Sequence, residues 1–176
     1  SGYVAMKMTE GRSPFKLKLT NHTALKSKVN VCIHGIDQGT WVLMPHQVAS
    51  LERPIHIAEK FCAYAVGSEG GKAIGLTAGD VNNGLIKITF TPEIEPLPLP
   101  VISSSAPTFL SAKRSRADFG EAGVGTEGTS HQTFQKVDDF ETDGSKAVTI
   151  NLRIVESKTT PRPLSSALSN PIPPAI

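Results

Sequence analysis

The sequence contains no long apolar run, few aromatic residues and only two cysteines among its 176 residues. No segment approaches the roughly 20 consecutive apolar residues of a membrane-spanning helix, so no membrane span is predicted. Aromatic residues make up 6% of the chain and the net charge is only +2. Nucleic-acid-binding proteins usually combine a dense basic surface with aromatic side chains that stack on bases. The composition therefore gives no strong signal for nucleic-acid binding.

The two cysteines, Cys32 and Cys62, are too few for a disulfide framework. They could form one bridge or remain thiols, and so low a count favours thiols. Cys62 lies among Phe61, Ala63 and Tyr64, surroundings that are typical of an inert buried thiol and not of a catalytic one. No G-x-S-x-G motif is present to supply a serine nucleophile. The sequence therefore predicts a protein that is not an enzyme.

The histidines provide one candidate metal site. Cys32 and His34 are two residues apart on an expected strand, so both side chains would lie on one face. His46 or Cys62 could supply a further ligand. However, the spacing matches none of the close ligand pairs of zinc sites. The favoured interpretation is a core cysteine beside hydrogen-bonded histidines, so we expect no metal, no cofactor and no catalytic residue.

Two loop segments resemble binding motifs only in part. The acidic run 138–143 offers carboxylates that could bind calcium, but it lacks the register of a helix-loop-helix calcium site. The glycine-rich segment 67–84 lacks the phosphate-loop spacing, because Ala73 and not Ser or Thr follows Lys72. We therefore expect a solvated acidic loop and a hairpin loop.

Two shorter motifs are equally nonspecific. The basic cluster 113–116 is followed closely by Asp118 and Glu121, which is typical of a solvated loop. Asn21, His22 and Thr23 form a glycosylation sequon, which matters only if the protein is secreted. Neither motif predicts a function by itself.

Alternation of apolar and polar residues is the main positive feature of the sequence. Side chains of a strand point to opposite faces with a period of two. Alternating or strand-like segments occupy 15–20, 29–34, 40–44, 60–66, 85–91 and 147–155. In 46–54 a strand is favoured over a short helix. Because helical periodicity is almost missing, the sequence predicts an all-β fold, an antiparallel β-sandwich with jelly-roll-like or Greek-key connections.

Proline is distributed unevenly, and this divides the chain. We expect an N-terminal arm or edge strand at 1–13, one β-sandwich domain at 14–156 and an extended Pro-rich C-terminal arm at 157–176. A Pro-, Gly- and Ser-rich excursion at 92–133 interrupts the domain. Alternating prolines favour extended chain over helix or central strand.

The contrast between a β core and extended arms suggests a structural role. Extended arms can bind neighbouring subunits through their unpaired backbone groups. The leading hypothesis is a non-enzymatic subunit of a large assembly, such as a viral capsid, decorating, penton or spike protein, contacting other subunits through its Pro-rich arms. It implies a virion or other extracellular particle that is assembled in the cytoplasm. The alternative is a lectin-like, calcium-assisted module that binds glycans through loops at 67–84 and 118–146.

Overall fold

The structure, a computed structural model, describes residues 2–96 and 119–158. Strands dominate the described part. They are β1 (Gly2–Met6), β2 (Arg12–Pro14), β3 (Leu17–Thr20), β4 (Ser27–Ile33), β5 (Ile36–Leu43), β6 (Val48–Leu51), β7 (Glu59–Ala65), β8 (Leu85–Pro92), β9 (Phe119–Thr129) and β10 (Val148–Ser157). Within residues 2–96 and 119–158, one α-helix, α1 (Glu69–Ala73), and one 3-10 helix, η2 (Gly144–Lys146), complete the elements.

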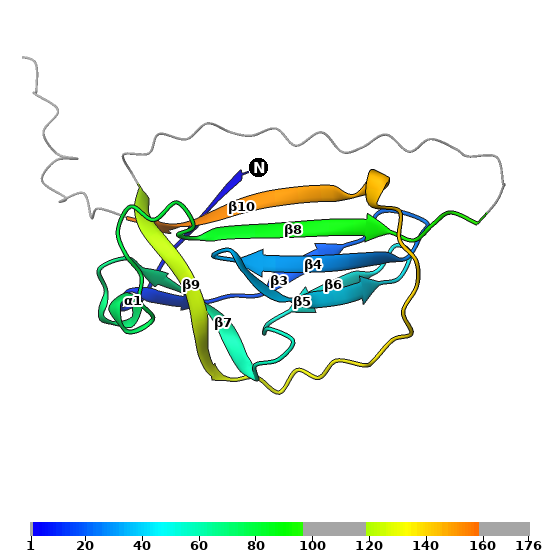
Figure 1. Ribbon diagram of the computed structural model, residues 1–176. Coiled ribbons are helices and arrows are strands. Elements are labelled where there is room, and N and C mark those ends of the chain that lie inside the picture. The colour runs from blue at the N-terminus through cyan, green and yellow to red at the C-terminus, as the bar shows by residue number, and fades with distance from the viewer. Residues whose placement is uncertain (1, 97–118, 159–176) are drawn as a thin grey trace, which may run out of the picture.

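The strands form two sheets (Figure 1). The larger sheet has the order β2-β7-β9-β10-β8-β4-β5, and β1 pairs with β10 outside this path. The smaller sheet contains β3 and β6. All of these pairs are antiparallel except β1 with β10, which is parallel. The prediction of an all-β sandwich built from antiparallel sheets is therefore confirmed.

Apolar side chains from both sheets meet in a single core. On β4, Val29, Val31 and Ile33 are buried at alternate positions, as the period of a strand requires. Leu17 and Leu19 of the smaller sheet belong to the same core cluster. Full burial of one such side chain contributes roughly 1.5–3 kcal/mol. The alternation in the sequence thus gives each sheet its buried face.

The β4–β5 hairpin has a tighter turn than the gap between the expected strand segments 29–34 and 40–44 would allow. Strand β5 already begins at Ile36, so the turn consists of His34 and Gly35, which have φ angles of 53° and 74°. Two residues with positive φ are characteristic of the turn that best matches strand twist. Gly39 instead lies within β5, at the point where the pairing between β4 and β5 shifts register. A Cβ at this position would lie 2.7 Å from the Ile55 side chain.

Three further expectations need correction or refinement. Residues 119–129, inside the predicted excursion 92–133, form β9, which pairs with β7 and β10. Segment 67–84 is not only a hairpin loop, because it contains α1, which Ser68 caps by accepting a hydrogen bond from the Gly71 N–H. Within 1–13, β1 is an edge strand and β2 begins.

Segment 46–54 contains β6, as the favoured interpretation predicted. Several predicted segments lie outside the described residues. These are the Pro-rich run after Pro96, the basic cluster 113–116 and the C-terminal arm beyond residue 158.

Candidate functional site

The candidate metal ligands, which the sequence analysis weighed and did not favour, are not brought together. His34 lies in the hairpin turn and not on β4, and its Nε2 is 3.4 Å from a carboxylate oxygen of Asp80. The Cys32 thiol lies 3.5 Å from the Asn30 side-chain oxygen. His46 follows the far end of β5. Among the described residues there is no group of three or more His, Cys, Asp or Glu side chains able to hold a metal.

Both cysteines are free thiols. Cys62 is fully buried in β7, and its Sγ lies 3.4 Å from a carboxylate oxygen of Glu127. Burial, followed by this carboxylate, raises the pKa of the Cys62 thiol to about 11. A thiol that stays protonated at neutral pH is a poor nucleophile. The surroundings predicted for Cys62 from its neighbours are therefore those observed.

The two loops proposed for a glycan site lie at opposite ends of β8 (Figure 1). Loop 67–84 leads into the first residue of β8, whereas the acidic run 138–143 contacts the chain just after its last residue, through the bridge between Glu93 and Thr142. Eight strand residues span about 26 Å. Residues 119–129 are strand and not loop. The acidic run therefore lies far from loop 67–84, whereas residues 119–129 pack directly against that loop through Gly123 and Gly125.

The acidic run is engaged in contacts within the chain. Lys28 forms an ion pair with Asp139 at 2.5 Å, and hydrogen bonds from Lys28 lower the pKa of that carboxyl. Asp143 caps η2 by accepting a hydrogen bond from the backbone N–H of Ser145 at 3.0 Å, and the Ser145 side chain lowers its pKa. These two carboxylates already have hydrogen-bonding partners that would compete with a calcium ion.

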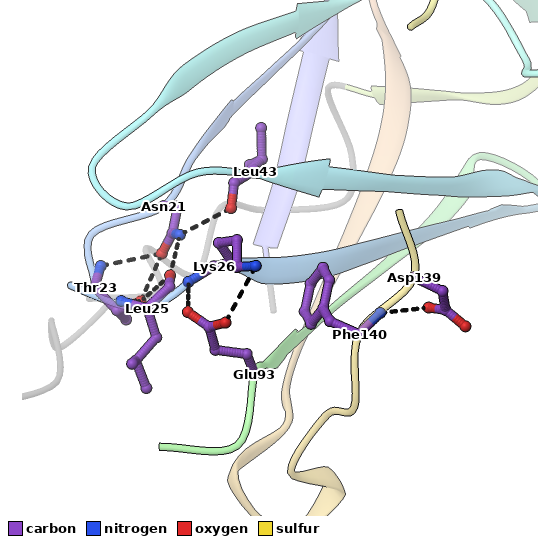
Figure 2. Close-up of polar contacts among 8 residues, drawn as sticks. All are labelled: Asn21, Thr23, Leu25, Lys26, Leu43, Glu93, Asp139 and Phe140. Atoms are coloured by element: carbon purple, nitrogen blue, oxygen red, sulfur yellow. Dashed lines mark hydrogen bonds and ion pairs between the residues drawn. The ribbon is translucent and has the colours of Figure 1, made fainter. Parts of the chain in front are cut away.

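These contacts belong to a polar network that organises one end of the sandwich. We call this region the clasp end and define it as residues 21–28, 43–48, 92–95 and 139–148. Figure 2 shows its centre. The region contains the end of β5, the end of β8 and the start of β10.

Asn21 connects two loops of the clasp end. Its side chain is 2% exposed, and its N–H groups donate to the backbone oxygens of Leu25, Leu43 and Met44 at 2.7, 3.3 and 3.0 Å. Its side-chain oxygen accepts from both the backbone N–H and the hydroxyl of Thr23. The nitrogen of the predicted sequon is thus buried and fully bonded in the folded chain. An Asn followed two residues later by Thr is compatible with such a turn, but the sequence does not indicate the burial.

Lys26 and Lys28 join the beginning of β4 to the segments after β8 and β9. The backbone N–H of Lys26 donates to a Glu93 carboxylate oxygen at 2.9 Å, and its ammonium lies 3.4 Å from the other. Both ammonium groups also lie over the Phe140 ring, at 4.7 and 5.2 Å from its centroid. Cation–π contacts of this kind contribute about 0.5–1 kcal/mol each at exposed sites. Sequence analysis missed both lysines, because nothing in a single strand shows which distant ring it faces.

Large apolar side chains are exposed on this ordered framework. Half or more of the surface of each remains accessible; they are Met44 at 50%, Val48 at 52%, Ile94 at 53% and Val148 at 58%. The backbone beneath them is fixed, since Ile94 donates its N–H to Glu141 and Asp143 donates its N–H to Pro92. Exposed apolar groups on a rigid, polar-rimmed surface are typical of protein–protein contacts.

Two general findings complete the description. The residues described include no helix that is both long enough and apolar enough to cross a membrane. Comparisons with protein-family models, curated proteins and solved structures found no match to this chain.

Proposed function

We propose that this chain is a non-enzymatic structural subunit of a large multi-subunit assembly, such as a viral capsid, decorating, penton or spike protein. The observation that carries the proposal is the clasp end, where exposed apolar side chains stand on a backbone fixed by buried hydrogen bonds. A surface that is already ordered loses little conformational entropy on binding. A neighbouring subunit is the partner that best fits such a surface.

The position of the Pro-rich segment supports the same role. The described chain reaches Pro96 directly after Ile94 and Glu95, which belong to the clasp end. The sequence continues from there into segment 97–118, and its prolines at 98, 100 and 107 favour extended chain. The proposal also includes that this segment contacts a neighbouring subunit and that the protein is located in a virion or other extracellular particle.

The proposal is tested by the oligomeric state of the full chain. Sedimentation velocity over a wide concentration range and electron microscopy should reveal oligomers or particles. Ile94→Glu combined with Val148→Glu should abolish them, because each places a charge on the apolar surface. The control is Val81→Glu, since Val81 is 76% exposed in the loop that precedes the opposite end of β8.

Circular dichroism shows whether each variant is folded, so loss of assembly can be distinguished from unfolding. Loss of assembly in the double variant but not in Val81→Glu supports the proposal. A wild-type chain that stays monomeric at all concentrations and is recovered as a free protein from its native source would refute it.

A further inference from the structure

Residues 130–143 form a long connection between β9 and η2 that contains no helix or strand. Figure 1 shows this segment, in yellow, running along the edge of the molecule from the end of β9 towards η2. We call it the strap. Connections of this length without secondary structure are uncommon in compact domains and often have a function of their own. The strap is attached at two places, and each attachment includes a carboxylate.

The first attachment binds the strap to the end of β6 and the residue after it. The Gln132 side chain accepts a hydrogen bond from the backbone N–H of Glu52 at 2.9 Å and donates one to the backbone oxygen of Ser50 at 2.7 Å. It therefore bonds to the chain as a peptide group of a neighbouring strand would. The Ser130 hydroxyl donates to the Glu52 carboxylate at 2.6 Å. Glu52 is thus bound to the strap through both its backbone and its side chain.

This attachment also covers the single tryptophan. The Phe134 ring packs edge-on against Trp41, with ring centroids 5.6 Å apart and an interplanar angle of 71°. Arg53 lies over the Phe134 ring, 4.4 Å from its centroid, and its Nε donates to the Gln132 backbone oxygen at 2.7 Å. The Trp41 indole N–H is buried and has no acceptor among the described residues. A buried donor without a partner is unfavourable, and water could satisfy this N–H once the strap opens.

The second attachment lies at the clasp end. Here the strap places Phe140 against the ammonium groups of Lys26 and Lys28, and Asp139 pairs with Lys28. Residues 135–138, between the attachments, are exposed. Beyond Phe140, backbone hydrogen bonds fix the chain, such as the one from the Ile94 N–H to Glu141. Residues 130–139 therefore depend mainly on side-chain contacts, apart from the Ser130 N–H, which donates to the backbone oxygen of Ala58 at 2.8 Å.

We propose that the strap is an acid-releasable cover: protonation of Glu52 and Asp139 detaches residues 130–139 and uncovers Trp41 and the neighbouring edge of β6, while both sheets stay folded. The charged groups facing Glu52 are Lys16, at 3.4 Å, and Lys60. The cation facing Asp139 is Lys28. Protonation leaves these cations without their carboxylate partners. The release does not depend on the proposed role in assembly.

The direction of the pH dependence follows from these contacts. The hydrogen bond from Ser130, then Lys16, holds the pKa of Glu52 below its usual value of 4.5, and Lys28 lowers that of Asp139 from 3.8. When the pKa of a carboxyl group is lower in the closed state than in the open state, the group stabilises the closed state at pH values above its open-state pKa. This stabilisation is lost as the pH falls. The strap should therefore stay closed at neutral pH. Its stabilisation should begin to fall below about pH 4 to 4.5, and the strap should open as the pH falls through the lowered pKa values of Glu52 and Asp139 in the closed state.

Fluorescence of Trp41 provides a direct measurement, because it is the only tryptophan. Acrylamide quenching of the full chain is measured from pH 7 to pH 3, and far-ultraviolet circular dichroism follows the sheets in parallel. We expect quenching to rise at a higher pH than the loss of strand signal. In Glu52→Gln combined with Asp139→Asn, we expect increased quenching already at pH 7 with unchanged circular dichroism. The matched control, Glu69→Gln, changes the charge of α1 and should behave like the wild type.

Two results would overturn the proposal. In the first, quenching and circular dichroism change together in the wild type, which means that acid only unfolds the whole chain. In the second, the double variant remains as protected from acrylamide at pH 7 as the wild type. If the double variant fails to fold, Phe134→Ala replaces it. If this variant shows increased quenching but keeps the change in Trp41 quenching in acid, that change cannot be assigned to release of the strap.

Discussion

Asn21 is the side chain on which the loops of the clasp end depend most. It makes five hydrogen bonds in total, and it is 2% exposed. Asn21→Ala leaves buried backbone oxygens without their donor, and each such group costs about 1–3 kcal/mol. We expect the free energy of unfolding, measured by urea denaturation, to fall by about 3 kcal/mol.

The control for this prediction is Asn30→Ala. The Asn30 amide also makes three hydrogen bonds, to Asp37, Gly39 and Thr40, but it does so where water has access. Water can replace these bonds, so the loss should stay below about 1 kcal/mol. Equal losses in the two variants would show that burial of Asn21 is not what makes it important.

At the scale of elements, the connection from loop 67–84 into β8 depends on close backbone approach. Gly84 has a φ of 70°, and a Cβ there would lie 2.3 Å from the backbone oxygen of Ile154. Gly35 has nearly the same φ, 74°, but a Cβ there would meet no atom within 4 Å. Gly35→Ala should therefore cost about 1–2 kcal/mol of backbone strain alone. Gly84→Ala should cost about 1–3 kcal/mol more, because β8 and β10 must separate.

Thermal or urea unfolding of the two glycine variants measures the difference directly. Because the φ angles of the two glycines are alike, the difference between the two losses of stability isolates the steric contribution at Gly84. If both substitutions destabilise the chain equally, the close approach between Gly84 and β10 does not limit the packing.

The strands also show which elements can be predicted from the sequence. Strands such as β4 and β8 were predicted because each has one apolar and one polar face, which alternation records directly. Strand β9 was missed because it contains Gly123 and Gly125, which have no side chains to alternate. A Cβ on either would meet Leu76 or Ile74, at 2.3 and 3.0 Å, so the glycines make room for loop 67–84. That packing depends on contacts distant in sequence.

The clasp end could be predicted only in part for a related reason. The acidic run that contains Asp139 was recognised from composition, but its partner Lys28 is more than a hundred residues away in the sequence. In the sequence, Lys26 and Lys28 indicate only a solvent-facing surface around the start of β4. Burial of Asn21 and the contact of Phe140 with two lysines follow from how the strands are arranged, which local patterns do not determine.

At the scale of the whole molecule, β7 links stability to alkaline pH. This strand lies between β2 and β9, and it buries both Cys62 and Tyr64. Burial is the main cause that raises the pKa of Cys62 from 9.0 to about 11 and that of Tyr64 from 10.0 to about 12. A folded-state pKa above the unfolded value stabilises the fold below the unfolded pKa, and this stability is lost as pH rises. We therefore expect the free energy of unfolding to fall from pH 9 towards pH 12.

Urea denaturation at a series of pH values, with reducing agent present, tests this prediction. Cys62→Ala and Tyr64→Phe should each flatten the alkaline fall, whatever they cost at pH 7, because each removes one group that ionises more readily in the unfolded chain. If the Cys62 and Tyr64 variants lose stability above pH 9 as steeply as the wild type, groups other than these two control the alkaline limit. The buried face of β7 would then contribute to stability through packing alone.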